Sequence, residues 1–355
     1  MSRVPTSAIW RRVDELIDTA PALAALRAHR LQLLAGRRWR ATGREIPDDL
    51  RTEEQLAAIR DAIAPELLAR VRSATKQPVV LLKGPEVARR YPGPALRHFI
   101  DLDLLVPDAD RLQAELLAAG FDEDADPMWA FRLGRDVDLF ADKHHCRPLR
   151  WAAWPLRLEI HRRPSWPAWL PEPPVEELLG LAQPADFDGM LTLPPGPHAL
   201  ILAAHLWVSN PFARLRDVLD LALLLQEVDA TEVDELASAW EVGRMWATTR
   251  AVAESVLLEP ATPSARRLWA RHLSSAREQT VLEVHVARWL SPFWALPLRR
   301  AIPVAATGVM DDLRPAAQEP WRAKARRTIR ALRNVRASKS RHDAEIGPER
   351  RQLRR

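Results

Sequence analysis

The segment that decides the fold is residues 79–120, VVLLKGPEVARRYPGPALRHFIDLDLLVPDADRLQAELLAAG. At its centre, Asp101 and Asp103 stand two positions apart in the apolar run FIDLDLLV, which is typical of a buried β-strand. Because successive side chains of a strand point to opposite faces, both carboxylates project from the same face. Two carboxylates on a mostly apolar strand are costly to bury unless a cation offsets their charge. The pair therefore predicts a divalent-cation site, with a spacing that suits two-metal phosphoryl transfer.

Two alternatives compete with this interpretation. The first is that the aspartates are simply solvated on an edge strand. The second is a rival pair with the same spacing, Asp136 and Asp138. Its neighbourhood is rich in charged residues, which favours an exposed hairpin edge over a metal site.

A phosphate-binding turn is predicted just before the aspartate strand. Residues 78–82 form a short apolar run, and Lys83 and Gly84 follow it at the start of a helix predicted for residues 85–90. Backbone N–H groups at a helix start attract phosphate, a lysine neutralises its charge, and a glycine allows close approach. Arg97, four residues before the first aspartate, is a further candidate for contacting the same phosphates.

A third carboxylate is predicted on a second strand. The pattern PLRLEIH of residues 155–161 alternates apolar and polar side chains, and Glu159 shares the polar face with His161. In two-metal transfer, a third carboxylate supports the metal nearest the acceptor hydroxyl and helps to remove its proton. We therefore expect Asp101, Asp103 and Glu159 to form the catalytic and metal-binding set.

The histidines are weaker candidates. His144 and His145 are adjacent, so on a strand they face opposite ways and make poor co-ligands of a metal. We expect them to shape the cleft instead. His205 lies in an apolar helical run, where a hydrogen-bonded core histidine is the commoner situation.

Composition and charge exclude several classes of protein. A single cysteine, Cys146, rules out an internal disulfide and a thiolate zinc cluster, and is consistent with a reducing cytosol. No secretory signal or spanning apolar stretch is apparent, so we expect a cytoplasmic protein. Residues 321–355 contain thirteen Lys/Arg and three Asp/Glu, a net of +10, which leaves −5 for the rest of a chain whose total is +5. The basic tail is therefore the only part suited to nucleic acid.

The order of the predicted elements indicates an α+β protein. A strand–helix–strand–helix unit lies between helical segments, with a proline-rich stretch after it. We expect five regions: an N-terminal helical segment (1–75), a core (76–164), a proline-rich connection (165–197), a C-terminal helical domain (198–290), and a proline-broken segment with a basic tail (291–355).

An ordered set of motifs resembles a known family: LLKG, YPGPALR, DLDLLV, AAGF, KHHCRPL, RLEIH and RLRDVLDLALLL. Over residues 46–225, the chain is similar to a largely uncharacterised family of bacterial nucleotidyltransferases within the DNA polymerase β-like superfamily. The resemblance implies a small polymerase β-like core with a mixed sheet flanked by helices. It also makes Asp101 and Asp103 the metal-binding pair and Glu159 the third acid. Lys83 and Gly84 stand where the wider superfamily commonly has Gly-Ser.

This resemblance implies an enzyme that moves a nucleoside monophosphate from a nucleoside triphosphate (NTP) to a hydroxyl or phosphate acceptor. Its cofactor would be one or two Mg²⁺, with Mn²⁺ as a substitute. A small-molecule acceptor is favoured, and the acceptor, nucleobase preference and oligomeric state are open. One alternative is a non-catalytic nucleotide-binding or regulatory protein of the same fold. Another is a toxin-like tRNA or RNA nucleotidyltransferase that uses the basic tail to bind RNA.

Overall fold

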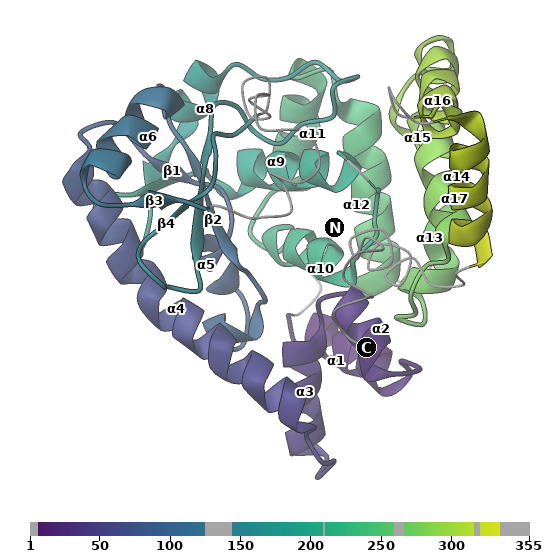
Figure 1. Cartoon of the computed structure of the whole chain (residues 1–355), viewed down its shortest axis with the longest axis horizontal. Helices are drawn as coiled ribbons and strands as arrows, with labels where there is room; N and C mark the ends of the chain where they lie inside the picture. Colours follow the sequence, from purple (N-terminus) through teal and green to yellow (C-terminus); the bar gives the residue numbers. More distant parts are fainter. Residues whose placement is uncertain (1–5, 125–143, 209, 259–265, 316–319, 334–355) are drawn as a thin grey trace. The chain divides into compact units, whose positions relative to one another are not determined.

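The computed structural model describes the chain except for residues 1–5, 125–143, 209, 259–265, 316–319 and 334–355 (Figure 1). The chain forms two compact units. The sheet unit comprises Leu31–His205 and Leu223–Glu241, and the helical unit comprises Met1–Arg30, Leu206–Ala222 and Val242–Arg355. Among the described residues, no helix is both long and apolar enough to cross a membrane.

The sheet unit contains a seven-stranded mixed sheet in the order β3-β4-β5-β2-β1-β7-β6. Its strands are β1 (Val80–Leu81), β2 (Asp101–Leu105), β3 (Asp122–Glu123), β4 (Leu149–Arg150), β5 (Arg157–His161), β6 (Gln183–Pro184) and β7 (Leu191–Thr192). The pairs β2–β5 and β1–β7 are parallel, and the other four pairs are antiparallel. The longest strands, β2 and β5, lie side by side at the centre of the sheet.

Helices surround this sheet. They are α3 (Gln32–Ala41), α4 (Asp48–Ala74), α5 (Pro85–Ala88), the 3₁₀ helix η1 (Pro94–Leu96), α6 (Ala109–Ala118), α8 (Val175–Leu181), most of α9 (Pro195–Trp207) and α11 (Ala230–Ala239). A mixed sheet flanked by helices confirms the predicted α+β class.

One face of the sheet is apolar and carries the core. Leu102 and Leu104 of β2 and Leu158 and Ile160 of β5 are fully buried there with residues of α4 and α6. Their polar neighbours along the same strands therefore project from the opposite face.

Helix α9 contacts the sheet unit beside that polar face. His198 Nε2 lies 2.6 Å from the backbone oxygen of Leu82, and the His205 ring lies against Lys83. Since His198 Nε2 faces a carbonyl oxygen, this nitrogen is the one that donates. The contact fixes α9 next to the end of β1, at the residue before the predicted phosphate turn.

Several local predictions need correction. Helix α5 ends at Ala88 after four residues, so it has little of the macrodipole expected for a helix of residues 85–90. The proline-rich connection contains α8 and the β6–β7 hairpin, and β7 pairs with β1. Short paired strands of this kind carry almost no sequence signal.

The helical unit is all-α in its described residues. Its helices are α1 (Thr6–Asp18), α2 (Leu23–Ala28), most of α10 (Leu215–Leu224), α12 (Gly243–Leu257), α13 (Arg266–Leu273), α14 (Val281–Leu290), α15 (Pro292–Ala295), α16 (Leu298–Leu313) and α17 (Trp321–Arg333). The helical domain expected for residues 198–290 contains α10, α12, α13 and α14.

A stacked pair of buried histidines, His29 and His272, lies in the core of the helical unit with ring centroids 5.9 Å apart. His29 Nδ1 accepts from the Leu215 backbone N–H, so its Nε2 must donate to the oxygen of Arg277, 2.8 Å away. His272 Nε2 likewise donates to the Phe212 oxygen. Burial lowers the pKa of His29 to about 4 and the pKa of His272 to about 3.

Acid should therefore destabilise the protein. Both histidines bind a proton more readily when unfolded, so the free energy of unfolding is highest above pH 6.5 and falls as the pH drops toward 4. We expect a loss on the order of a few kcal/mol between about pH 6.5 and pH 4.5, measured by urea unfolding. In His29→Gln, which keeps one donor and one acceptor but does not titrate, the dependence should be flatter. An identical slope in the variant would contradict this origin.

Candidate active site

The register of two strands brings two of the predicted carboxylates together. In the parallel pair β2–β5, Asp103 is the direct partner of Glu159, and Asp101 is the partner of Arg157. Both residues of the first pair project from the polar face, as the alternation of each strand predicts. Asp103 is 5 % exposed, and Glu159 is half-buried. The sequence could not supply the pairing itself, because it joins two distant segments.

His161 completes a compact group with these two acids. Its Nε2 lies 3.0 Å from Asp103 Oδ1 and 4.0 Å from Glu159 Oε2. One ligand atom from each of the three residues lies within 4.8 Å of the others. Sequence reasoning placed His161 on the face of Glu159 but did not nominate it as a ligand. The signal was available, because the two-residue spacing of Glu159 and His161 on a strand puts both side chains on one face.

Lys83 provides positive charge to this group. Its Nζ lies 3.4 Å from Asp103 Oδ1 and 3.2 Å from Nδ1 of His205, and its side chain is 13 % exposed. His205 is therefore more than the core histidine that the sequence suggested, since its ring contacts the ammonium that neutralises Asp103. Both side chains come from outside the central strands, one from the turn after β1 and one from α9.

The electrostatics of the two acids differ. Burial alone would raise the pKa of Asp103, but the charge of Lys83 and the hydrogen bond from His161 hold it well below its usual range. Burial raises the pKa of Glu159, and repulsion from Asp103 and Asp101 raises it further. The charge of Asp103 is thus neutralised by its neighbours, whereas Glu159 is surrounded by more negative than positive charge.

Asp101 lies at the edge of this arrangement. It is half-exposed and is not among the three groups whose ligand atoms lie within 4.8 Å. Its charge reaches Glu159 and also Arg60 of α4, where it opposes the desolvation that lowers the pKa of that guanidinium. The structure therefore gathers Asp103, Glu159 and His161 more tightly than the predicted aspartate pair.

The turn after β1 requires glycine. Gly84 has φ +70° and ψ −126°, and a Cβ there would lie 3.2 Å from Leu102 Cδ2 and 3.4 Å from the Asp101 oxygen. The guanidinium of Arg97, only 3 % exposed, donates to the Gly84 oxygen over 3.3 Å. Arg97 therefore contacts the backbone of the turn that presents Lys83.

Two further histidines lie against His161. The rings of His144 and His145 have centroids 5.3 Å and 5.6 Å from the His161 ring, and they contact each other edge to face. A backbone bridge joins His145 to His161. These contacts agree with the expected role of the pair in shaping the cleft.

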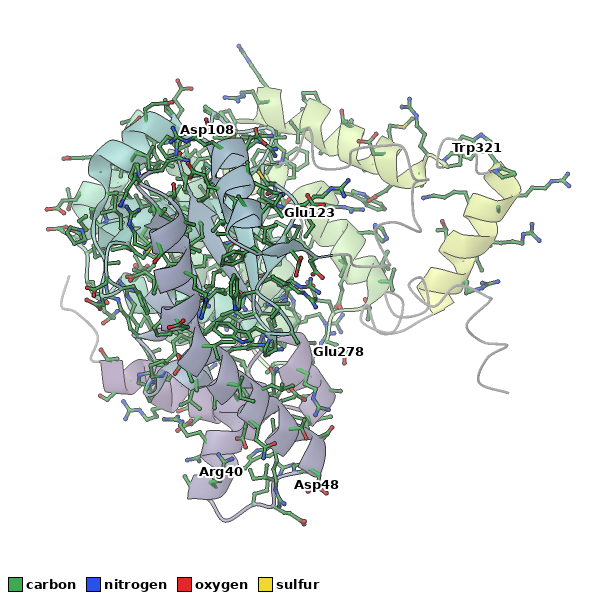
Figure 2. The ribbon with its side chains drawn as sticks, turned by 60° about the vertical axis from the view of Figure 1, so that its left-hand side comes forward. Arg40, Asp48, Asp108, Glu123, Glu278 and Trp321 are labelled. Carbon is green, nitrogen blue, oxygen red and sulfur yellow. The ribbon has the colours of Figure 1, made fainter. Side chains whose placement is uncertain are left out.

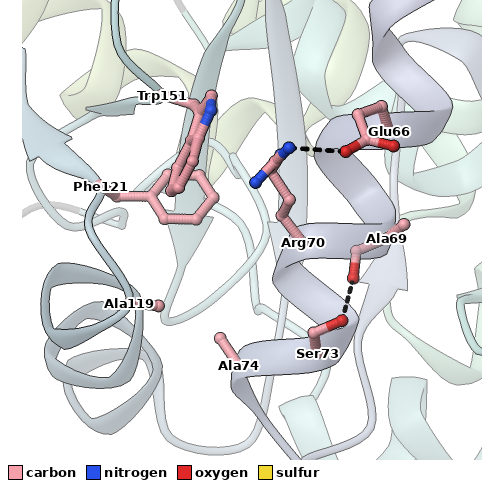
Figure 3. A pocket seen from close by; sticks show the side chains of 8 residues that line it. All are labelled: Glu66, Ala69, Arg70, Ser73, Ala74, Ala119, Phe121 and Trp151. Atoms are coloured by element: carbon pink, nitrogen blue, oxygen red, sulfur yellow. Dashed lines mark hydrogen bonds and ion pairs between the residues drawn. The ribbon is translucent and has the colours of Figure 1, made fainter.

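Other features of the sheet unit lie apart from this group. The rival aspartates at positions 136 and 138 fall outside the described residues. A cavity of about 350 Å³ is lined by residues of α4, the end of α6 and Trp151, with Arg70 stacked on the Trp151 ring at 4.3 Å (Figure 3). Phe121, which lines the cavity, belongs to the core on the apolar face. The residues that line the cavity do not include Asp103, Glu159 or His161.

The three-residue group fits a divalent cation. Two carboxylates and an imidazole are ligands that Mg²⁺, Mn²⁺ and related ions accept, although Mg²⁺ prefers oxygen ligands and water. A cation there would offset the repulsion that raises the pKa of Glu159. The Lys83 ammonium already lies beside Asp103, which shows that this position favours positive charge.

Comparison with known proteins identifies the family. The model of a family described as uncharacterised nucleotidyltransferase matches residues 15–257, more than half of the 355-residue chain. No curated protein and no solved structure matches the chain at a significant level. The family's name gives transfer of nucleotidyl groups as its general chemistry, which implies a nucleotide substrate. The polar face of β2 and β5 lies within the matched range, and the chain belongs to this nucleotidyltransferase family.

Proposed function

We propose that the chain is a Mg²⁺-dependent enzyme that transfers a nucleoside monophosphate from an NTP to a hydroxyl or phosphate acceptor. In this reaction the acceptor oxygen bonds to the α-phosphorus, the bond from that phosphorus to the bridging oxygen breaks, and pyrophosphate leaves. The observation that carries the proposal is the group of Asp103, Glu159 and His161 beside Lys83. Family membership supports the transferase class.

Asp103 and Glu159 would hold the metal, with Asp101 as the outer acid and His161 fixing the orientation of Asp103 through their hydrogen bond. When bound, Mg²⁺ supplies positive charge to the triphosphate and lowers the pKa of an attacking hydroxyl. Glu159 is the direct strand partner of Asp103 and lies on the same polar face, so its carboxylate is our candidate for accepting the acceptor's proton.

Lys83 would bind the phosphates. Its ammonium lies beside Asp103, and Gly84 allows the positive φ of the turn that presents it. Arg97 supports this turn through the Gly84 oxygen. Phosphoryl transfer depends on positioning and charge, which suits a site of carboxylates and cations without a covalent nucleophile. A small-molecule acceptor remains our preference, and no described contact identifies it.

Asp103→Asn and Asp101→Asn should each abolish measurable transfer. Loss of a carboxylate from the cation site removes charge that the reaction needs, and we expect a fall of roughly a thousand-fold for Asp103→Asn. The measurement is transfer of label from each α-labelled NTP to a fraction of cell extract, with and without Mg²⁺. Glu66→Gln, on the cavity side of the sheet, is the matched control and should keep full activity.

The same assay separates this proposal from a non-catalytic nucleotide-binding protein. Mg²⁺-dependent thermal stabilisation by an NTP without any transfer would support the non-catalytic alternative. Label recovered in RNA alone would make RNA the acceptor. Full activity in both aspartate variants would show that the site lies elsewhere.

Neutralising the two central acids should have opposite effects on stability without metal. Asp103→Asn removes the partner of Lys83, so we expect a loss of about 2 kcal/mol in the free energy of unfolding. Glu159→Gln removes a repelled carboxylate and should leave stability unchanged or raise it. Urea unfolding in EDTA measures both. A larger loss for Glu159→Gln than for Asp103→Asn would contradict this charge distribution.

His205→Ala should weaken transfer by about ten-fold because Lys83 loses a hydrogen-bonded neighbour at its charged end. The loss should appear mainly in the Michaelis constant for NTP, since Lys83 is assigned to phosphate binding. His205→Gln, which keeps an acceptor, should restore most of the activity. Equal loss in both variants would indicate a packing role instead.

A further inference from the structure

Helix α16 of the helical unit has an exposed apolar face. Four apolar residues at spacings of four, eight and three along it are unusually exposed for their type: Leu298 66 %, Ile302 58 %, Met310 53 % and Leu313 50 %. The 3.6-residue period places these side chains on one side of the helix. Such a continuous exposed apolar face normally marks an interaction surface.

The neighbouring side of α16 is already packed. Ala301 and Ala305 are buried, and Asp312 accepts hydrogen bonds from the Trp289 indole at 2.7 Å and joins the His285 ring at 3.0 Å on α14. The orientation of α16 is therefore fixed from its inner side. The apolar face is directed outward as a consequence of this packing.

Helix α17 also has an exposed apolar stripe, and it carries more positive charge than α16. Trp321 is 67 % exposed and Ile329 is 53 % exposed, and with Ala325 they form a stripe at four-residue spacing. Figure 2 labels Trp321 at the start of the helix. Exposed arginines flank the stripe at the next positions along the chain: Arg322, Arg326 and Arg330.

The charge of this segment selects its partner. Helix α17 contains six Lys/Arg and no Asp/Glu, and residues 298–333 contain nine Lys/Arg against three Asp/Glu, a net of +6. A second copy of the same surface would be repelled. Nucleic acid would be attracted by the arginines, but its phosphates would make no favourable contact with the four exposed apolar side chains of α16. An anionic lipid surface takes both, since apolar side chains enter the acyl boundary while arginines contact headgroups.

We propose that α16 and α17 form a peripheral docking surface for anionic phospholipid bilayers. Helix α17 would lie at the interface with Trp321 and Ile329 directed inward, and α16 would add its aliphatic face. The surface lies outside the family match, which ends at residue 257, so it is a property of this chain rather than of the matched region. The proposal does not depend on the nucleotidyltransferase activity.

Co-sedimentation of the full chain with vesicles tests the proposal. Vesicles of phosphatidylcholine alone are compared with vesicles that also contain phosphatidylglycerol, at about 0.1 M and about 0.5 M salt. We expect binding to the anionic vesicles only, reduced at high salt. The variant Trp321→Ser/Ile329→Ser should bind about ten-fold more weakly, as should Arg322→Gln/Arg326→Gln/Arg330→Gln.

A control keeps the test specific. Ile59→Ser removes an exposed apolar residue of α4 in the sheet unit, 46 % exposed, and should bind vesicles as the unaltered chain does. Circular dichroism of every variant checks that the fold is kept. Absence of binding, or equal binding to both vesicle types, would overturn the proposal. RNA binding that is lost in the arginine variant but kept in the Trp321/Ile329 variant would also overturn the proposal. A dimer of the unaltered chain that the Trp321/Ile329 variant disrupts would overturn it as well.

Discussion

The parallel pairing of β2 with β5 is the constraint on which the candidate site depends. In this register, Asp103 faces Glu159 and the next polar residue on β5, His161, reaches back to the same aspartate. A shift of one residue would turn Glu159 and His161 into the apolar core and bring leucines to the polar face. The leucines and isoleucine that fill the core beneath α4 and α6 therefore fix the carboxylate geometry as well as the fold.

The charges on the polar face are tolerable only as a group. Asp103 is almost fully buried, and a lone carboxylate in that position would be protonated or would unfold the region. Lys83 and His161 keep it ionised, and His205 contacts Lys83 in turn. Well-packed hydrophobic residues would serve stability at least as well as this arrangement. The proposed binding of a cation and phosphates gives this arrangement a role other than stability.

Local sequence patterns predicted the features that are set within one strand or one turn. They missed the features that are set by contacts between distant segments. Strand alternation placed Asp103 and Glu159 on polar faces, and Gly84 was recognised as a turn glycine before β2. The contact of His205 with Lys83 joins α9 to the turn after β1, 122 residues apart, and no spacing encodes it. The β6–β7 hairpin was missed because each strand has two residues and is stabilised mainly by its neighbours. The strand alternation that predicted Glu159 as a site residue also places His161 on the same face, and so could have predicted it.

The two proposed binding surfaces rely on different physics, and salt separates them. The pair of Lys83 and Asp103 is buried, so mobile ions screen it little. The arginines flanking Trp321 on α17 are exposed, and their attraction to an anionic bilayer weakens within a Debye length of about 8 Å at physiological salt. The apolar faces of α16 and α17 are insensitive to screening and would limit the loss of membrane binding as salt rises. The proposed nucleotide site and the proposed lipid surface should therefore respond differently to salt.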